Sequence, residues 1–158
     1  MTFDAVCSQQ NVLYAAVRSS HVIYELSIKK NGFGLTAKKE LVSNNPDGVQ
    51  TVSDITVHAG RIFIASAGEH GGIMHYQNKT WVSVLQSTQD VHVHGLAFLN
   101  ELLLFTDPKH HRICTHTDNQ VQTWAGSDRE GSQDGPVMLS SFGQPTGKRL
   151  QISTTTFT

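Results

Sequence analysis

Short apolar runs are separated by polar turns along this chain, and the most apolar run recurs three times. The three runs are Asn11–Val17, Arg61–Ala67 and Leu102–Pro108. They occupy the same place in successive units of about 40–50 residues, a period that is typical of stacked supersecondary units. A continuous apolar run bounded by turn residues indicates a strand that is buried on both faces. No segment shows a sustained helical period, so the pattern predicts an all-β chain.

The third unit has the clearest boundaries. Asn100 and Glu101 mark a turn before the apolar run, and Asp107-Pro108 marks the turn after it. Proline fixes φ, and an aspartate side chain bonds to the local backbone, so both residues favour a turn at this point. The unit is therefore predicted to be one antiparallel meander. Its expected strands are Gly95–Phe98, Leu102–Thr106, Arg112–His116 and Val121–Trp124.

The other two units are predicted to have the same four-stranded order. The strands expected in the second are Asp54–Val57, Arg61–Ser66, Gly72–Tyr76 and Trp81–Leu85, and in the first Asp4–Cys7, Val12–Val17, His21–Ile28 and roughly Lys39–Val42. Turns are predicted at Ala59-Gly60 and Asn78-Lys79 in the second unit and at Asp118-Asn119 in the third. Repeated four-stranded sheets are the blades of a β-propeller. The predicted fold is thus a partial, open propeller of about three antiparallel blades, which span approximately residues 1–43, 52–86 and 93–126.

The third unit and the segment after it also carry specific motifs. Gly95-Leu-Ala-Phe98 is followed by Asp107-x-x-His110-x-Arg112-Ile113, and a connecting segment follows. This order resembles NHL repeats, in which Asp-x-x-Asn-x-Arg-Ile lies between two strands and a Gly-Ser…Asp-Gly…Phe-x-x-Pro-x-Gly connection leads to the next repeat. The resemblance is good over residues 91–147, fair in the second unit and weak in the first. The motif residues of the connection are Gly126, Gly135, Phe142, Pro145 and Gly147.

The resemblance implies more blades than this chain supplies. NHL propellers typically have about six blades, and closed propellers in general have about 4–8. Residues 142–147 match the start of a fourth unit, but Lys148-Arg149 follows where apolar strand residues belong, so 148–158 is an atypical tail that suggests truncation. An open arc leaves apolar blade faces uncovered. We therefore expect a fragment of a larger protein, or a chain that associates with itself or a partner.

The resemblance also implies a structural role for Asp107 and Arg112. In the family's pattern this pair staples the turn before the third strand, which we interpret as a local ion pair worth about 0.2–1 kcal/mol if exposed. One departure is that His110 stands where the family has asparagine. Histidine keeps a hydrogen-bonding side chain but tolerates a left-handed backbone less readily.

Composition narrows the possible partners and the compartment. The formal net charge is −1, and the lysines and arginines are scattered among acids, whereas nucleic-acid binders usually show a basic patch. Cys7 and Cys114 fall in different units, which favours two reduced thiols in a reducing compartment. There is no basic region followed by an apolar stretch at the start, and no apolar run near the ~18 residues of a membrane span. We expect a cytoplasmic protein without membrane contact.

Nine histidines raise the question of a metal site. Neutral imidazoles bind zinc, and some NHL-type propellers resemble peptidyl-hydroxyglycine lyases, which use zinc in this way. The histidine spacing differs between the units, so no ring of equivalent ligands is implied, and turn or strand-edge roles explain these residues equally well. We predict no cofactor. The metal candidates to be examined are His92, His94, His110 and His111.

The sequence therefore favours a non-catalytic scaffold for protein–protein interaction, with no predicted catalytic residue. Loops on one propeller face would carry the contacts, because loops held by a rigid scaffold commonly bind. Two alternatives stay open: a metal-dependent lyase or hydrolase propeller, and an RNA-binding NHL module of a ubiquitin-ligase-like protein. The two main candidate loops are Asp107–His111 and Ser127–Asp134, and Gly68–Gly72 is a third. The residues predicted to bind are Asp107, Lys109, His110, His111, Ser127, Asp128, Arg129 and Asp134.

Overall fold

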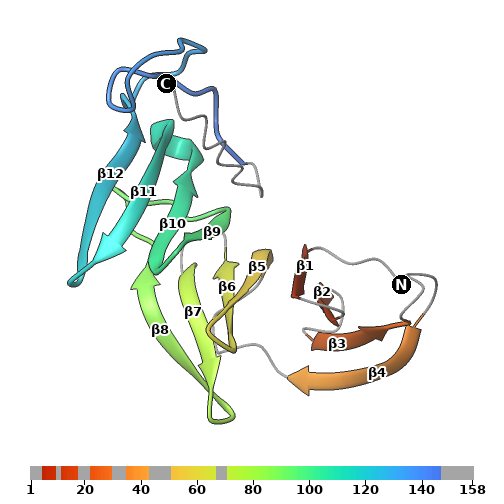
Figure 1. The fold of residues 1–158 in the computed structure, drawn as a ribbon. Coiled ribbons are helices and arrows are strands. Elements are labelled where there is room, and N and C mark those ends of the chain that lie inside the picture. The colour runs from red at the N-terminus through yellow and green to blue at the C-terminus, as the bar shows by residue number, and fades with distance from the viewer. Residues whose placement is uncertain are drawn as a thin grey trace.

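The chain folds into three four-stranded antiparallel sheets, which we call blades 1, 2 and 3 (Figure 1). A computed structural model describes residues 5–9, 12–17, 22–29, 35–42, 51–66 and 71–146. Within these residues the regular elements are strands, apart from one 3-10 turn at Pro108–His110. The all-β prediction is confirmed. No helix in this part of the chain is long and apolar enough to cross a membrane.

Each blade is a simple meander in which neighbouring strands follow one another in the sequence. Blade 1 contains β1 (Ala5–Gln9), β2 (Val12–Val17), β3 (Val22–Ile28) and β4 (Leu35–Val42). Blade 2 contains β5 (Val52–His58), β6 (Arg61–Ser66), β7 (Gly72–Gln77) and β8 (Thr80–Gln86). Blade 3 contains β9 (Leu96–Leu99), β10 (Leu102–Asp107), β11 (Arg112–Thr117) and β12 (Gln120–Gly126). The three apolar runs form β2, β6 and β10 of separate sheets, as the repeat predicts.

The three blades are arranged with their first strands on the same side of the molecule. Their first strands contact each other, β1 against β5 and β5 against β9, while β4, β8 and β12 lie at the outside (Figure 1). This is the arrangement of strands in a propeller, where the first strand of each blade lies nearest the axis.

The repeat is closer in backbone register than in sequence. The turn between the second and third strands is flanked by the pairs Val17↔Val22, Ser66↔Gly72 and Asp107↔Arg112 in blades 1, 2 and 3. The next pairing is interrupted at the same position in every blade, immediately after Ile23, Ile73 and Ile113. A bulge of this kind bends and twists a strand, so the three blades share the same curvature.

Several predicted turns are confirmed by their backbone angles. Both residues have positive φ at Ala59-Gly60, at Asn78-Lys79 and at Asp118-Asn119. Two consecutive left-handed residues match the right-handed twist of the flanking strands, as in type I′ hairpins. Asparagine, aspartate and glycine adopt this conformation most readily, which is why these turns could be read from the sequence.

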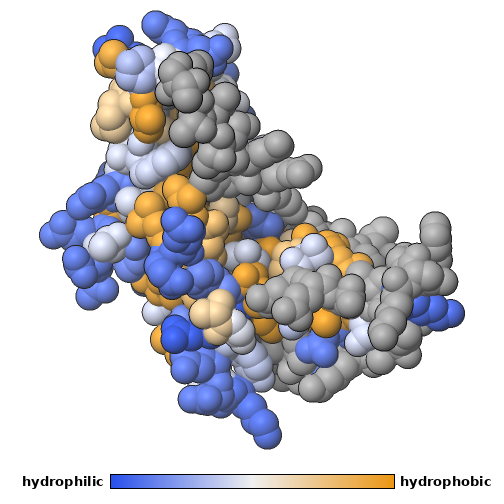
Figure 2. All heavy atoms as spheres, in the orientation of Figure 1, coloured by the Kyte–Doolittle hydropathy of each residue, from blue (hydrophilic) through white to orange (hydrophobic). Residues whose placement is uncertain are grey.

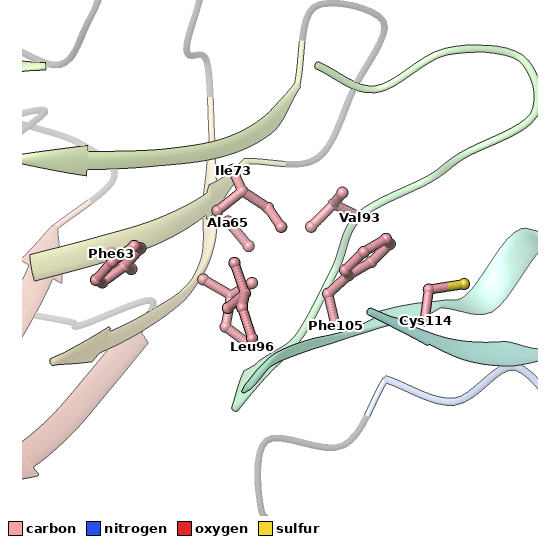
Figure 3. Packing of buried hydrophobic residues seen from close by; sticks show 8 residues of the cluster. Phe63, Ala65, Ile73, Val93, Leu96, Phe105 and Cys114 are labelled. Atoms are coloured by element: carbon pink, nitrogen blue, oxygen red, sulfur yellow. The ribbon is translucent and has the colours of Figure 1, made fainter. Parts of the chain in front are cut away.

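Two apolar clusters hold the blades together. The first lies between blades 1 and 2, where Ala16 and Ile23 meet Ile62 and Ile64. The second lies between blades 2 and 3 (Figure 3). There Phe63, Ala65 and Ile73 of β6 and β7 pack with a group supplied by blade 3 and the segment before it, namely Val93, Leu96, Leu103, Phe105 and Cys114.

A buried polar link accompanies the second cluster. Asp54 on β5 is 3% exposed, and its Oδ2 accepts a hydrogen bond of 2.9 Å from the backbone N–H of Leu96. Its Oδ1 accepts from the N–H of Ile55 at 2.8 Å. The neighbouring Ser53 donates its hydroxyl to the carbonyl of His94 at 2.7 Å. Two consecutive side chains of blade 2 therefore bind the backbone at and just before the first strand of blade 3.

Some predicted boundaries are wrong. β4 begins at Leu35, four residues before the expected strand, and β12 continues to Gly126. Asp107 belongs to the end of β10, because its backbone pairs with Arg112 and its side chain is fully buried. Trp81 packs against the first cluster. Gly147, the 148–158 tail and most of the loop Gly68–Gly72 lie outside the described residues.

We predict that Asp54→Ala lowers the free energy of unfolding by about 2–4 kcal/mol, because the substitution leaves two buried N–H groups without an acceptor. Chemical denaturation followed by circular dichroism measures the loss. The matched control is Asp134→Ala at an exposed position, which should change stability by less than about 0.5 kcal/mol. Equal effects of the two substitutions would show that Asp54 does not join the blades.

Candidate functional site

The two main loops predicted to bind meet at one end of blade 3. The first is the turn between β10 and β11, Pro108–His111, and the second is the segment after β12 that begins at Ser127. Arg112, at the start of β11, joins them. Its Nε donates to Asp107 Oδ2 at 3.1 Å, and its Nη1 lies 3.5 Å from Asp128 Oδ1.

A third segment, which the sequence did not point to, completes this end of the blade. The turn Thr88–Val91 lies between blades 2 and 3. The backbone carbonyls of its two central residues accept hydrogen bonds from a lysine and an arginine of blade 3. Arg112 Nη2 donates to the carbonyl of Asp90 at 2.6 Å, and Lys109 Nζ donates to that of Gln89 at 3.1 Å. We call these three segments, 88–91, 108–111 and 127–130, the loop cluster.

Asp107 is the anchor of the loop cluster and is not itself a surface residue. It is 0% exposed, and both of its oxygens have donors. The backbone N–H of His92 donates to Oδ1 at 3.2 Å, and the His110 ring lies 2.9 Å from Oδ2 through Nδ1. A carboxylate only accepts, so Nδ1 of His110 carries the hydrogen. The Asp107–Arg112 pair is confirmed, but the carboxylate is fully buried and Arg112 is only 17% exposed, so the value expected for an exposed pair does not apply.

His111 ties the loop cluster to the connecting segment that follows blade 3. Its backbone is left-handed, with φ 51° and ψ 40°. Its Nδ1 accepts a hydrogen bond of 3.2 Å from the backbone N–H of Gln144. The left-handed residue of this turn is thus His111, whereas His110 lies in the 3-10 turn. The low tolerance of histidine for a left-handed backbone therefore applies to His111 and not to His110.

Close backbone approach explains one glycine of the predicted motif. Gly126 has φ +104°, and a Cβ there would lie 2.6 Å from the carbonyl oxygen of His111. Gly126 pairs with Arg112, and the equivalent pair in blade 2 is Gln86 with Gly72. Gly72 also has positive φ, and a Cβ there would meet the backbone of Leu85 and Gln86. Blades 2 and 3 therefore each place one glycine at this pair, on opposite strands.

The four candidate metal ligands are used in different ways. The backbone N–H of His92 donates to the carboxylate of Asp107, and the ring of His110 donates to the same carboxylate through Nδ1. The ring of His111 accepts a hydrogen bond from the backbone N–H of Gln144. His94 lies between blades 2 and 3, and its Nδ1 is buried without a hydrogen-bond partner. Among the described residues, no three or more histidine, cysteine, aspartate or glutamate side chains are grouped as metal ligands would be.

Neither thiol is disposed to act as a nucleophile. Cys7 and Cys114 are free and lie in different blades. Burial, with a smaller effect of the nearby Asp54 charge, raises the pKa of Cys7 to about 12. Burial also raises the pKa of Cys114, to about 11. Since the thiolate is the reactive form, both side chains remain protonated and inert at neutral pH.

The remaining predicted residues are exposed. Ser127, Asp128 and Arg129 lie at the surface of the loop cluster or beside it. Asp134 is set apart, on the lining of a groove of about 520 Å³ between blade 3 and the connecting segment. Phe142 lines the same groove, and its backbone forms an isolated parallel β-bridge with that of Glu130. This pairing joins the two ends of the connecting segment.

Solved lyase structures share this fold. A virginiamycin B lyase from Staphylococcus aureus matches with a TM-score of 0.57 and 15% identity, over 77% of this chain and 40% of that one. A streptogramin B lyase matches with a TM-score of 0.56 and 19% identity, over 77% and 40%. A catalytically inactive variant of the S. aureus virginiamycin B lyase, solved with quinupristin, matches with a TM-score of 0.58 and 17% identity, over 82% of this chain and 43% of that one.

At these identities the likeness shows the fold alone: the chain is an open arc of three propeller blades. It spans about two fifths of the length of the lyase structures that it matches. No protein-family model matches the sequence. No curated protein matches it either.

We predict that Asp107→Ala destabilises the protein by about 3–5 kcal/mol, because Arg112 and the N–H of His92 would lose a buried partner. Asp128→Ala removes the other carboxylate beside Arg112, but Asp128 is 60% exposed, so its loss should cost no more than about 1 kcal/mol. Denaturant unfolding of both variants gives the comparison. Similar losses in the two variants would contradict the anchoring role of Asp107.

Proposed function

We propose that this chain is the three-blade part of an NHL-type propeller that serves as a protein-interaction scaffold, with the loop cluster of blade 3 as its contact surface. The propeller is larger than these three blades, which make up about two fifths of the structures that they match. A cytoplasmic location fits the two free cysteines.

The observation that supports this proposal is the fixed geometry of the loop cluster. Arg112 contacts Asp107, Asp128 and the carbonyl of Asp90, so one side chain holds all three segments. A surface that is ordered before it binds loses less conformational entropy in a complex. Loops that have no such anchor would have to be ordered by the partner.

The chemistry of the exposed side chains favours a protein partner. Lys109 and Arg129 supply positive charge, and Asp128 and Glu130 supply negative charge, over a short stretch of surface. Charges of both signs set register and suppress wrong partners at protein interfaces. A phosphate backbone, by contrast, requires clustered lysines and arginines without interspersed acids.

The lyase structures that share this fold support a second candidate, in which the chain forms part of a propeller enzyme that acts on streptogramin-type compounds. The local chemistry favours the scaffold. Asp107 and His110 are engaged with each other and with Arg112, which leaves Asp107 no free oxygen to present to a substrate or an ion.

We predict that reversing the charge of the basic side chains of the loop cluster abolishes most of the binding to the partner. Proximity cross-linking in cells identifies proteins near the loop cluster, and titration calorimetry with the purified partner then measures affinity. Lys109→Glu and Arg129→Glu should each raise the dissociation constant at least about tenfold, because charges that match across an interface become like charges.

The matched control is Lys79→Glu, at the exposed turn between β7 and β8. This variant should bind as the unchanged protein does. If all three variants bind equally well, or if Lys79→Glu weakens binding as much as the others, the loop cluster is not the contact surface.

The second candidate has its own test. We expect no consumption of quinupristin by the purified chain in the presence of Mg²⁺ or Zn²⁺, measured by liquid chromatography with mass detection. Consumption that is lost in a His110→Ala variant would contradict the scaffold proposal and favour the enzyme.

A further inference from the structure

The outer strand of blade 2 has an unpaired edge. This strand, β8, is the last in its sheet and pairs with β7 on one side. On its other side, no strand of the described residues pairs with it. In an antiparallel sheet, alternate residues of an edge strand direct their N–H and carbonyl groups away from the neighbouring strand. Blade 2 lies between blades 1 and 3, so a further blade of a larger propeller would not pack over this edge.

The first part of β8 lacks the features that usually prevent an edge strand from pairing. Natural edge strands are protected by charged side chains, by proline or by bulges. The sequence of β8 contains no charged residue and no proline. A bulge interrupts its pairing with β7 between Ile73 and Met74, which leaves Thr80–Ser83 as the regular part of the edge. This part is free of all three kinds of protection.

The outer strands of the other two blades differ from β8. The sequence of β4 contains three consecutive charged residues, Lys38, Lys39 and Glu40. β12 is uncharged, but the backbone N–H of its last residue, Gly126, donates to the carbonyl of Val137 in the connecting segment at 3.1 Å. Blade 2 therefore has the outer edge that is best suited to accept another strand.

An exposed apolar side chain lies on the same part of the edge. Val82 pairs with His75 and is 44% exposed. The equivalent residue of β12 is the polar Gln122, which pairs with Thr115 one position after the bulge, as Val82 does in blade 2. Figure 2, drawn in the orientation of Figure 1, shows hydrophobic residues among polar ones on the side of the molecule where β8 lies. Val82 therefore offers an apolar contact to a strand that is added beside β8.

We propose that Thr80–Ser83 binds an extended peptide segment of a partner protein, which joins blade 2 as an additional strand. An extended backbone is the ligand that matches a row of N–H and carbonyl groups, and several peptide-binding domains use this mode. The segment is uncharged and places an apolar side chain opposite Val82, because cross-strand neighbours of like polarity stabilise a sheet. Thr80–Ser83 lies toward the turn to β7, whereas the loop cluster follows the other end of β8, so the inference does not depend on the loop cluster.

A synthetic peptide tests the edge directly. In the probe, valine and threonine alternate between two terminal lysines, and both ends are blocked. We expect the full chain to bind it with a dissociation constant of about 100 μM or tighter, measured by isothermal titration calorimetry. A second peptide of the same sequence carries N-methyl groups on its central backbone nitrogens. It should not bind, because it cannot donate hydrogen bonds to the edge.

A pair of matched variants locates the binding on β8. Val82→Glu removes the apolar contact and places a charge on the edge, and it should raise the dissociation constant of the peptide at least about fivefold. The new charge is opposite to that of the peptide, so repulsion cannot cause the loss. The control is Gln122→Glu at the equivalent position of β12, which should leave the affinity unchanged. Circular dichroism confirms that both variants are folded.

Three results would overturn the proposal. The first is that the unmethylated peptide does not bind, or that the methylated peptide binds equally well. The second is that Val82→Glu and Gln122→Glu weaken binding to the same extent, because binding would then not be specific to β8. The third is a dimer, seen by light scattering of the chain alone, that Val82→Glu dissociates and Gln122→Glu does not. The edge would then pair with a second copy of the chain and not with a partner's segment.

Discussion

The packing of each blade on the next is the constraint on which the rest of this structure depends. A four-stranded sheet of about 30 residues cannot bury both of its own faces, so its apolar side chains are covered only by a neighbouring sheet. Phe63, Ala65 and Ile73 of blade 2 are buried because Leu96 and Phe105 of blade 3 lie over them. Asp54 fixes the position of blade 3 on blade 2, because its carboxylate accepts a hydrogen bond from the backbone N–H of Leu96.

The same constraint positions the loop cluster and creates the groove. Because Leu96 is fixed, the segment before it is fixed too, and the N–H of His92 reaches the buried carboxylate of Asp107. Asp107 in turn orients Arg112, which gathers the three segments of the cluster. At the other face of blade 3, no sheet among the described residues packs over the blade, and Ile113 and Ala125, which correspond to the buried Ile73 and the partly buried Leu85 of blade 2, line a groove. A polar, preorganised surface and an apolar, uncovered one therefore arise from one repeated unit.

The repeat, the four-stranded units and most turns could be predicted, because apolar runs such as Leu102–Thr106 and pairs such as Asp118-Asn119 carry local signals. Contacts between blades could not. Asp54 looks like an ordinary strand residue in the sequence, and its partner is 42 residues away. The pairing of Asp107 with Arg112 was visible from the motif. Its further partners were not, because they are the backbone N–H of His92 and the backbone carbonyl of Asp90, which no pattern of side chains reveals. The left-handed position was misplaced by one residue because a short 3-10 turn precedes His111.

Amide hydrogen exchange at Leu96, measured by NMR, tests the central claim most directly. This N–H lies at the start of β9 and donates to a side chain of the neighbouring blade. If the blades are locked together as described, it exchanges as slowly as the amides of Ile64 and Phe105 in the buried strands. Exchange as fast as that of the exposed turn at Asn78-Lys79 would show that blades 2 and 3 separate freely, and would contradict the account.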